Sequence, residues 1–550
     1  MTRRSWAVPR AGLVLSAMVA LAVAGCGGSG GDGDGDDNAS DGDAPDSVTL
    51  RFDQDWDSMD FHVDLREGNL SAAGPAYDRL VARDREGKEY VPYLAESWEE
   101  TPTSLVFQVR TDAKCEDGHV LTAEDMAASF TRFLEVEKRS GSVAASTIGG
   151  LGPGPWKIEA TGETEVTLTT EAPYGNKLAV FAEVGVVCPA GMEAVKADEH
   201  ALEDATYGSG PYTLVSATHG DRIVYKLRPE WNWGPPDTTT DTMPREIVLR
   251  VVEDSTTAAN MLLSGELDIS QVDGADIDRL SANDAVTSYG ITNYLPHTFV
   301  WNMRPGRPLA LDQPNSAALR EALATVVDPE QWNVAANDGR GTVVSGPFRP
   351  EAPCYNAEVE NLAPTPSVDA AKEALTSGGF TYDGEKLMSD GEQVRLTLLT
   401  TPLLNAGPEY LADLVRSLGI DVKLENLAGA SFGEKVVNGD FDTAVLRGDR
   451  LPPIPGIGLN PMSGPATPDG YNVGGTGIGD PDFERLVKAG EQSLGDEQCA
   501  AYAELQELMV SKHYVRSLAV VDPQIFVSSE LSTPKVLPVR PYPVWWITGA

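Results

Sequence analysis

Residues 394–424 read VRLTLLTTPLLNAGPEYLADLVRSLGIDVKL, and this stretch decides the fold. Apolar residues alternate over 394–398, as in a strand, and recur with helical spacing over 411–418. Gly419 then offers the left-handed cap that commonly ends a helix, and alternation returns over 420–424. Strand, helix and strand with short connections predict a βαβ unit whose two strands are parallel, and therefore an α/β fold.

The same mixture of patterns extends outward in both directions. Residues 105–110 alternate as a strand, and residues 122–125 form a capping box that predicts the start of a helix. In that helix we expect one buried apolar stripe, made of Met126, Phe130, Phe133 and Leu134. We also expect a strand at 247–252, a helix after it that ends at Gly265, and helices at 316–327, 369–377 and 497–509.

The amino terminus predicts export. A basic segment with arginines at positions 3, 4 and 10 precedes an uncharged run over 11–24, which is shorter than the roughly 20 apolar residues of a membrane span. This arrangement is typical of a secretory signal, so residues 1–25 are predicted to be a signal peptide. The run ends in Val23-Ala24-Gly25-Cys26, which resembles a bacterial lipobox and implies lipidation of Cys26. The alternative is an ordinary signal followed by a chance cysteine.

Residues 26–47 then predict a flexible linker behind the lipidated cysteine. They are almost entirely Gly, Asp and Ser, and such a segment cannot bury enough apolar surface to offset its ordering entropy. Asp32, Asp34 and Asp36 alternate as in a calcium loop. The glycine at loop position six, the closing Glu and the flanking helices of such a loop are missing, so we expect no metal here.

Composition limits the class of protein. The net charge of −41 argues against nucleic acid as a partner, because phosphates require a basic surface. It is compatible with a cationic or zwitterionic ligand, and equally with solubility outside the cell. The mature chain is too long for one core and predicts two or three structural units. Four cysteines remain after Cys26, an even number that predicts two disulfides in an exported protein but allows three pairings.

Short motifs along the chain resemble, in order, those of the family 5 extracellular solute-binding proteins, the peptide- and nickel-binding lipoproteins of ABC importers. The most specific is PYLAESWE at residues 92–99, which resembles the family's "P-LAESWE". The others are YDRL at 77–80, LVFQVR at 105–110 with DG at 117–118 and TAED at 122–125, YGSGPY at 207–212, GELDI at 265–269, WNMR at 301–304, and LREAL at 319–323 with DPE at 328–330. Each is short, but they follow the family's order over nearly the whole mature chain.

The resemblance implies an α/β, two-lobed, periplasmic-binding-protein-like (class II) fold with a hinge and an extra subdomain in the first lobe. By analogy, lobe I comprises residues 48–270 plus 520–550, and lobe II comprises residues 271–519. The lobes are expected to close over a ligand in the cleft between them. Within this division, Cys115 with Cys188 and Cys354 with Cys499 are the expected disulfides, because each bridge then stays inside one lobe.

The resemblance also points to a ligand site. Peptide-binding relatives use a Trp and an Asp shortly after an "FD" strand. Phe441-Asp442 begins the matching strand, but the Trp position corresponds to Gly448 and the Asp position lies nearer Leu451, which argues against a peptide with a free amino terminus but not against the binding role. Asp449 in a shifted register is the alternative for the Asp position. The candidate cleft residues are Asp55, Trp56, Trp301, Asn302, Arg447, Asp449 and Tyr471. Arg447 and Asp449 have the alternative of solvated loop charges, and Trp301 that of a core position.

The expected function is therefore capture of a small solute, most often an oligo- or dipeptide, for an ABC permease and ATPase. We expect a monomer without cofactor, lipid-anchored on the outer face of the bacterial cytoplasmic membrane. An oligosaccharide or a metal chelate is the alternative ligand. An extracellular hydrolase is the rival class, but the sequence contains no H-E-x-x-H motif, and its six histidines are scattered without the spacing of metal ligands.

Overall fold

The computed structural model describes residues 44–60, 62–63, 67–84, 89–140, 155–290, 292–427, 429–448, 458–467, 472–532 and 547–549. The predicted signal peptide, the lipidation site at Cys26 and most of the linker lie outside the described residues. Within these ranges, no helix is long and apolar enough to cross a membrane.

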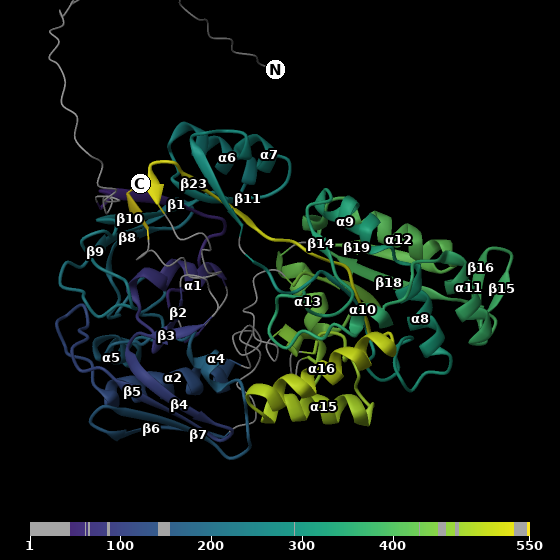
Figure 1. The fold of residues 1–550 in the computed structure, drawn as a ribbon, viewed down its shortest axis with the longest axis horizontal. Coiled ribbons are helices and arrows are strands. Elements are labelled where there is room, and N and C mark those ends of the chain that lie inside the picture. The colour runs from purple at the N-terminus through teal and green to yellow at the C-terminus, as the bar shows by residue number, and fades with distance from the viewer. Residues whose placement is uncertain are drawn as a thin grey trace, which may run out of the picture. The chain divides into compact units, whose positions relative to one another are not determined.

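A seven-stranded sheet contains strands from both ends of the described chain (Figure 1). Its order is β12-β23-β11-β1-β10-β9-β8, with β1 at Ser47–Phe52, β8 at Tyr212–Thr218, β9 at Arg222–Leu227, β10 at Glu246–Val251, β11 at Ile269–Val272, β12 at Val286–Gly290 and β23 at Gln524–Ser528. β1 is parallel to β10 and β11, whereas β23 is antiparallel to β11 and β12. The predicted strand at 247–252 is thus confirmed as β10, near the centre of this sheet.

A separate four-stranded antiparallel sheet has the order β4-β5-β7-β6, with β4 at Ala95–Thr101, β5 at Ser104–Val109, β6 at Trp156–Gly162 and β7 at Glu165–Thr170. Helix α2 (Ala123–Ser140) packs against β6 and β7. Its predicted capping box is confirmed, because the Asp125 amide donates to Thr122 Oγ1 at 3.2 Å and the Thr122 amide donates to the Asp125 carboxylate at 3.0 Å. The predicted apolar stripe of α2 is buried.

The predicted βαβ unit lies in a five-stranded sheet of order β19-β18-β20-β13-β21. The strands are β13 (Thr298–Trp301), β18 (Arg395–Thr400), β19 (Asp421–Asn426), β20 (Thr443–Leu446) and β21 (Val515–Ser517), and α12 (Gly407–Ser417) connects β18 to β19. β18 and β19 are parallel, as predicted. Gly419 has φ 84° and lies so close to the chain that an added Cβ would be 2.3 Å from the Glu385 carbonyl oxygen, so glycine is required at this helix end.

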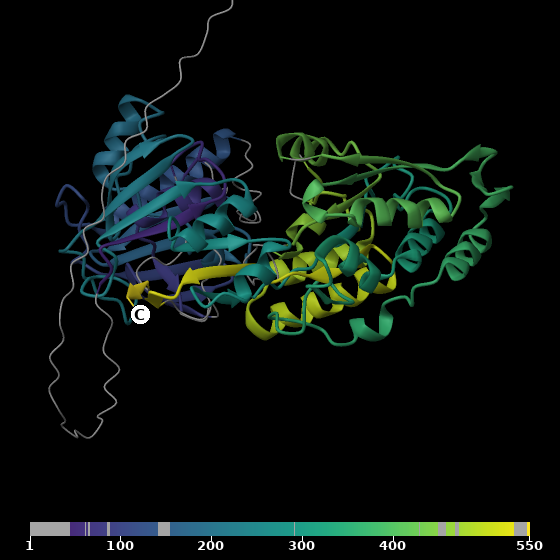
Figure 2. The same ribbon diagram turned by 90° about the horizontal axis from the view of Figure 1, so that it is seen from above.

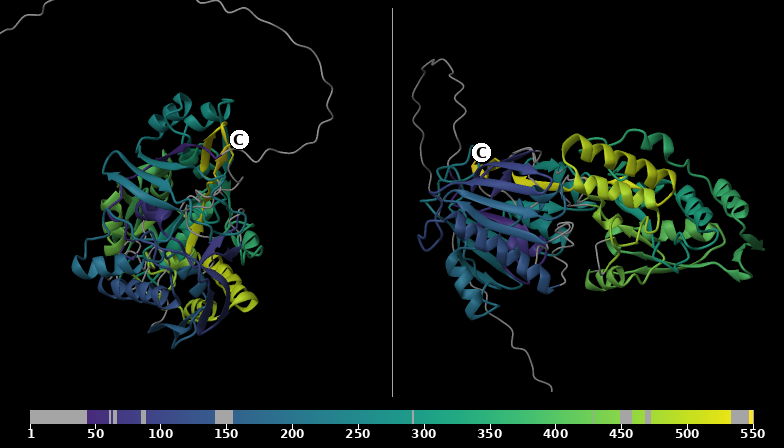
Figure 3. Two further views of the ribbon diagram at one scale, coloured as in Figure 1. Left: turned by 90° about the vertical axis from the view of Figure 1, so that its left-hand side faces the viewer. Right: turned by 90° about the horizontal axis from the view of Figure 1, so that it is seen from below.

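Helices surround this sheet. The three helices predicted at 316–327, 369–377 and 497–509 are confirmed as α8 (Ser316–Val326), α11 (Val368–Ser377) and α16 (Gly495–Ser511). Helix α15 (Pro481–Gln492) lies beside α16, as the yellow helices in Figure 2 and Figure 3 show. Helix α6 (Ser255–Ser264) begins at its Asp254 cap and ends at Gly265, as predicted.

The remaining described elements are shorter. They are α1 (Glu67–Ala73), η1 (Gly74–Ala76), β2 (Val81–Arg83), β3 (Tyr90–Pro92), α4 (Lys177–Phe181), α5 (Pro189–Ala197), α7 (Asp276–Ser281), α9 (Pro329–Asn337), β14 (Thr342–Val343), α10 (Val359–Leu362), β15 (Thr381–Asp383), β16 (Lys386–Ser389), β17 (Glu392–Gln393), η2 (Pro402–Leu404), α13 (Gly429–Asn438), η3 (Asn460–Met462), β22 (Ala519–Val520), β24 (Leu531–Ser532) and β25 (Thr548–Gly549).

Two large hydrophobic cores organise these elements. The first core comprises buried residues of 48–269 together with Ile525, Val527 and Ile547, and the second comprises buried residues of 295–519. A small third cluster packs α6 and α7 against the edge of the seven-stranded sheet. Because β12 belongs to that sheet, the sheet continues to Gly290.

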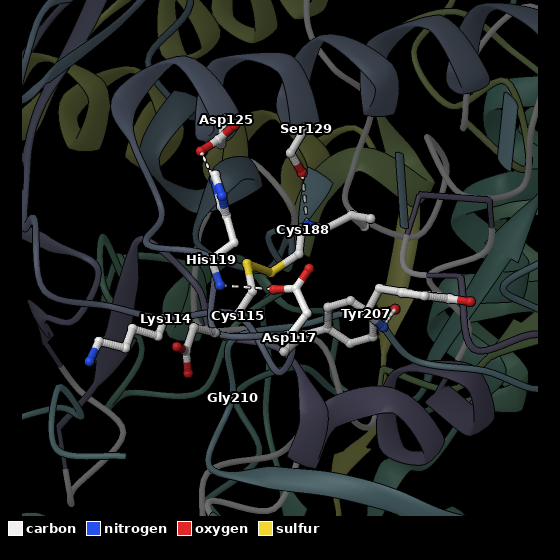
Figure 4. The surroundings of a disulfide bond; sticks show 12 residues. Lys114, Cys115, Asp117, His119, Asp125, Ser129, Cys188, Tyr207 and Gly210 are labelled. Carbon is white, nitrogen blue, oxygen red and sulfur yellow. Dashed lines mark hydrogen bonds and ion pairs between the residues drawn. A yellow bond between two sulfur atoms is a disulfide. The ribbon is translucent and has the colours of Figure 1, made fainter. Parts of the chain in front are cut away.

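Two disulfides are present, and they are the pairs expected from the sequence. Cys115 bonds to Cys188 in the first core, and Cys354 bonds to Cys499 beside the second core. Figure 4 shows the first of them next to the start of α2, where the His119 ring contacts Asp125 at 2.8 Å. This bridge ties the segment that precedes α2 to the residue that caps α5.

Candidate functional site

The ends of three neighbouring strands, β13, β18 and β20, lie at the same edge of the five-stranded sheet, the edge that runs across the strand ends. β18 and β20 are parallel, so their carboxyl ends meet at this edge, and β13 is antiparallel to β20, so its amino end lies there too. The carboxyl ends of parallel strands are where α/β proteins commonly bind ligands, because the chain must leave the sheet there and opens a crevice. The topology alone therefore singles out this edge.

A cavity of about 430 Å³ opens at this edge. Its lining residues come from the ends of the three strands, from α13 and from the segments around 347 and 458–473. They are Leu295, Pro296, Thr298, Pro347, Thr401, Leu403, Phe432, Val436, Val445, Leu446, Arg447, Gly448, Gly458, Pro461, Met462 and Val473. This volume falls within the range of about 300–1,000 Å³ typical of small-molecule pockets.

Gly448 shapes the wall of the cavity after β20. A Cβ added at this position would lie 2.5 Å from the Pro296 carbonyl oxygen and 2.6 Å from Leu295 Cβ, so only glycine permits the two chains to approach this closely. Glycine therefore adds no side chain to the cavity wall at this position and leaves that wall to Leu295 and its neighbours.

A second part of the cavity wall is formed by Thr401 and Leu403, which follow β18 in the chain. Thr401 caps the short helix η2, since its Oγ1 accepts from the Leu403 amide at 3.5 Å, and this turn presents the Leu403 side chain with 68% of its surface exposed. From α13, Phe432 and Val436 are one helical turn apart and face the same cavity. Both walls are consequently apolar.

Charge is sparse in this cavity. Among the described residues that line it, Arg447 is the only charged one, and its side chain is exposed. Thr298 and Thr401 are the other polar side chains among the described lining residues, and the Thr298 hydroxyl donates to the Pro296 carbonyl at 3.2 Å. The cavity thus differs from the rest of this strongly acidic chain.

The predicted site residues fall into separate groups. Arg447 lines the cavity. Trp301 and Asn302 are completely buried at the other end of β13. The Trp301 indole donates to the His513 carbonyl at 2.7 Å, and the Asn302 amide donates to the carbonyls of Gly439 and Phe441 at 3.0 and 2.8 Å. These bonds hold β13 against its neighbours, so both residues support the sheet and do not line the cavity.

Trp56 is buried in the first core, and its neighbour Asp55 is partly exposed. The Trp56 indole donates to Asp204 at 3.0 Å and stacks on the His219 ring, with centroids 4.1 Å apart. Asp55 accepts from the Gly220 amide at 2.8 Å. These contacts join the segment after β1 to the β8–β9 turn, and neither residue lines the cavity described above. Asp449 and Tyr471 lie outside the described residues.

Sequence reasoning missed the apolar lining. Leu295, Leu403, Phe432 and Met462 come from four distant segments, and in each segment they resemble ordinary core residues. One local signal was present, because Leu403 follows Pro402 immediately after a predicted strand, where an apolar side chain leaves the sheet. Within the described part of the chain, no group of three or more His, Cys, Asp or Glu side chains could hold a metal ion.

Comparison with known proteins identifies the family. Residues 89–468 match the model of the bacterial extracellular solute-binding proteins, family 5. The probable D,D-dipeptide-binding periplasmic protein of Escherichia coli (strain K12) is 26% identical over 416 residues, covering 71% of this chain and 72% of that protein. The dipeptide-binding protein of Bacillus subtilis (strain 168) is 24% identical over 462 residues, covering 80% of each chain.

Solved structures share the fold. A substrate-binding protein from Microbacterium hydrocarbonoxydans, complexed with 4-hydroxybenzoate hydrazide, is 26% identical with a TM-score of 0.70, covering 92% of this chain and all of that chain. A periplasmic binding protein from Helicobacter pylori in complex with the peptide STSA is 18% identical with a TM-score of 0.76, covering 92% of this chain and 99% of that chain.

These matches confirm the predicted mixed α/β periplasmic-binding-protein fold. They also confirm that the protein is an extracellular solute-binding component of an ABC transporter and not an enzyme, because the matched family consists of binding proteins. The family model covers more than half of the chain. The chain therefore belongs to the bacterial extracellular solute-binding proteins of family 5.

Proposed function

We propose that this protein captures a short peptide or a peptide-like small molecule and delivers it to the permease of an ABC importer. The observation that carries the proposal is the cavity of about 430 Å³ at the carboxyl edge of the five-stranded sheet. Two curated relatives are named as dipeptide-binding proteins, and the Helicobacter relative holds a peptide, which supports the peptide class. The Microbacterium relative holds an aromatic hydrazide, which extends the class to small amide-like compounds.

Two lobes would close over this ligand. In this proposal lobe I comprises residues 48–270 with 520–550, and lobe II comprises 271–519, which contains every described residue that lines the cavity. Two chain segments connect the hydrophobic cores, and they are hydrogen bonded to each other, since Asn293 N–H donates to Asp522 Oδ1 at 2.9 Å and His297 N–H donates to the Ala519 carbonyl at 2.8 Å. Such paired connections are suited to act as a hinge.

Lipidation of Cys26 would hold the protein at the outer face of the membrane, with the Gly/Asp-rich linker allowing the binding domain to reach its permease. The test is metabolic labelling with a palmitate analogue in a bacterial host. The native chain should incorporate the label and remain with the membranes, whereas Cys26→Ala should lose both properties. Membrane retention of an unlabelled Cys26→Ala chain would contradict lipid anchoring.

The ligand is tested by native mass spectrometry of the exported protein, purified without denaturation. A set of bound masses that fragment as short peptides is the expected result. A sugar or a metal chelate would retain the transport role but replace the substrate class. A protein that carries no ligand and shows no thermal shift with peptides, hydrazides, sugars or chelates would contradict solute capture by this cavity.

A further inference from the structure

The walls of the cavity favour one kind of ligand group. Leu295 and Met462 are almost completely buried beneath it, and Phe432 and Val436 cover one side from α13. Apolar walls of this kind gain free energy when they lose contact with water, and the gain is roughly proportional to the apolar area covered. A polar or charged ligand group placed here would lose its hydration and find few partners in return.

Leu403 is the sharpest sign of this preference. Its exposed fraction of 68% is the largest among the exposed large hydrophobic residues in the described part of the chain. It lines the cavity and lies in the short helix η2 that Thr401 caps. An apolar ligand group that enters the cavity would cover this side chain, so Leu403 is placed to contribute to affinity.

Charge and shape point the same way. No carboxylate is present among the described lining residues, and Arg447 is the only charged residue among them. Glycine at 448, held against Leu295 and Pro296, leaves the wall free of a large side chain. The cavity thus has room for a bulky group of the ligand.

We propose that this cavity selects ligands that carry a bulky, neutral, apolar group, aromatic or branched aliphatic, and that Leu403 is a specificity-determining residue. This inference rests on the proposed function, because it concerns the ligand of the same cavity. For a peptide, the selected group is a hydrophobic side chain. For a non-peptide ligand, it is an aryl or alkyl group next to an amide-like unit.

Isothermal titration calorimetry with matched tripeptides tests this preference. The peptides Ala-Phe-Ala and Ala-Leu-Ala should bind at least tenfold more tightly than Ala-Glu-Ala and Ala-Lys-Ala, with acetylated amino termini compared in parallel. Benzoic hydrazide, measured against acetic hydrazide, makes the same comparison without a peptide. In Leu403→Ala, the affinity for the apolar members should fall about tenfold, while that for the charged members should barely change.

Val334→Ala is the matched control, because Val334 is a 59% exposed apolar residue on α9 of the second core that does not line the cavity. This variant should bind as the native protein does. Equal affinity for all side-chain types, or an unchanged affinity in Leu403→Ala, would overturn the apolar preference while leaving solute capture intact. Failure of every probe to bind, in a protein whose melting curve is native, would overturn both this inference and the proposed peptide-like ligand.

Discussion

His62 is a completely buried histidine in the first core, and its protonation state is set by its neighbours. Its Nδ1 accepts from the Arg132 guanidinium at 2.9 Å, its Nε2 donates to the Gly185 carbonyl at 3.2 Å, and Arg132 also pairs with Asp60. Burial, together with the adjacent guanidinium and in spite of the attraction of Asp60, lowers the pKa of His62 to about 4. A second ring proton would have to face Arg132, so the neutral form is retained.

Acidification should therefore destabilise the protein through His62. Between about pH 6.5 and pH 4 the unfolded chain binds a proton at this histidine and the folded chain does not, so the free energy of unfolding falls as the pH falls. The expected loss between pH 7 and pH 4.5 is about 2–3 kcal/mol. In His62→Gln, urea unfolding at the two pH values should show a correspondingly smaller difference. The same pH dependence in both proteins would contradict this assignment.

At the scale of elements, the capping box of α2 shows how a local motif acts. Thr122 and Asp125 satisfy each other's amides at the first turn, where a helix otherwise leaves its amides without partners. Replacing Thr122 by Ala should lower the free energy of unfolding by about 1 kcal/mol. Thr131 on the same helix bonds only to the Ala127 carbonyl one turn before it, so Thr131→Ala should change the stability by less than about 0.5 kcal/mol. Equal effects in urea unfolding would argue against the cap.

Elements of this kind were predictable because their signals are local. The βαβ unit around Gly419, the Asp254 cap and the α2 stripe each depend on one continuous stretch of the sequence, and each is present. The cavity was not predictable, because residues from 295 to 473 meet only when the sheet forms. Trp301 illustrates the same limit, since every residue of β13 is buried, and its sequence gives no sign of which face meets a cavity.

At the scale of the whole molecule, each disulfide closes a loop within one part of the fold. Cys354 and Cys499 are 145 residues apart, and a bridge over a loop of that length reduces the entropy of the unfolded chain considerably. The double variant Cys354→Ala/Cys499→Ala should lower the free energy of unfolding by about 3–5 kcal/mol. Urea unfolding monitored by circular dichroism measures this loss, and an unchanged midpoint would contradict a stabilising bridge. Cys115→Ala/Cys188→Ala serves as the comparison for the first core.

A second feature at this scale is a contact that joins the two cores next to a buried carboxyl group, that of Glu491. The Gly175 amide donates to the Glu491 carbonyl at 2.6 Å, and Gln498 Nε2 donates to Asn176 Oδ1 at 3.3 Å. Burial raises the pKa of the Glu491 carboxyl to about 7. Since the buried carboxylate is costly only when ionised, the contribution of Glu491 to stability should be least favourable above about pH 7 and should improve as the pH falls from 7 toward 4.5, opposite in sign to the contribution of His62.

Glu491→Gln should remove this dependence. The variant keeps the shape of the side chain and the main-chain contact but cannot ionise, so it should be more stable than the native protein at pH 8 by about 1–3 kcal/mol and nearly equal to it at pH 5. Thermal unfolding of both proteins at these pH values gives the comparison. A constant difference between them at both pH values would show that Glu491 does not titrate near neutrality.

The paired connections between the cores have an evolutionary consequence. The chain enters and leaves the second core through neighbouring backbone near His297 and Ala519, so the whole second core is one continuous insertion between β12 and β23. Recombination at these two junctions could exchange that segment as a cassette. All described residues that line the cavity would travel with it, while the seven-stranded sheet and the exported amino terminus stayed unchanged. A lineage could in this way acquire a new nutrient in one genetic event and keep the machinery that delivers it.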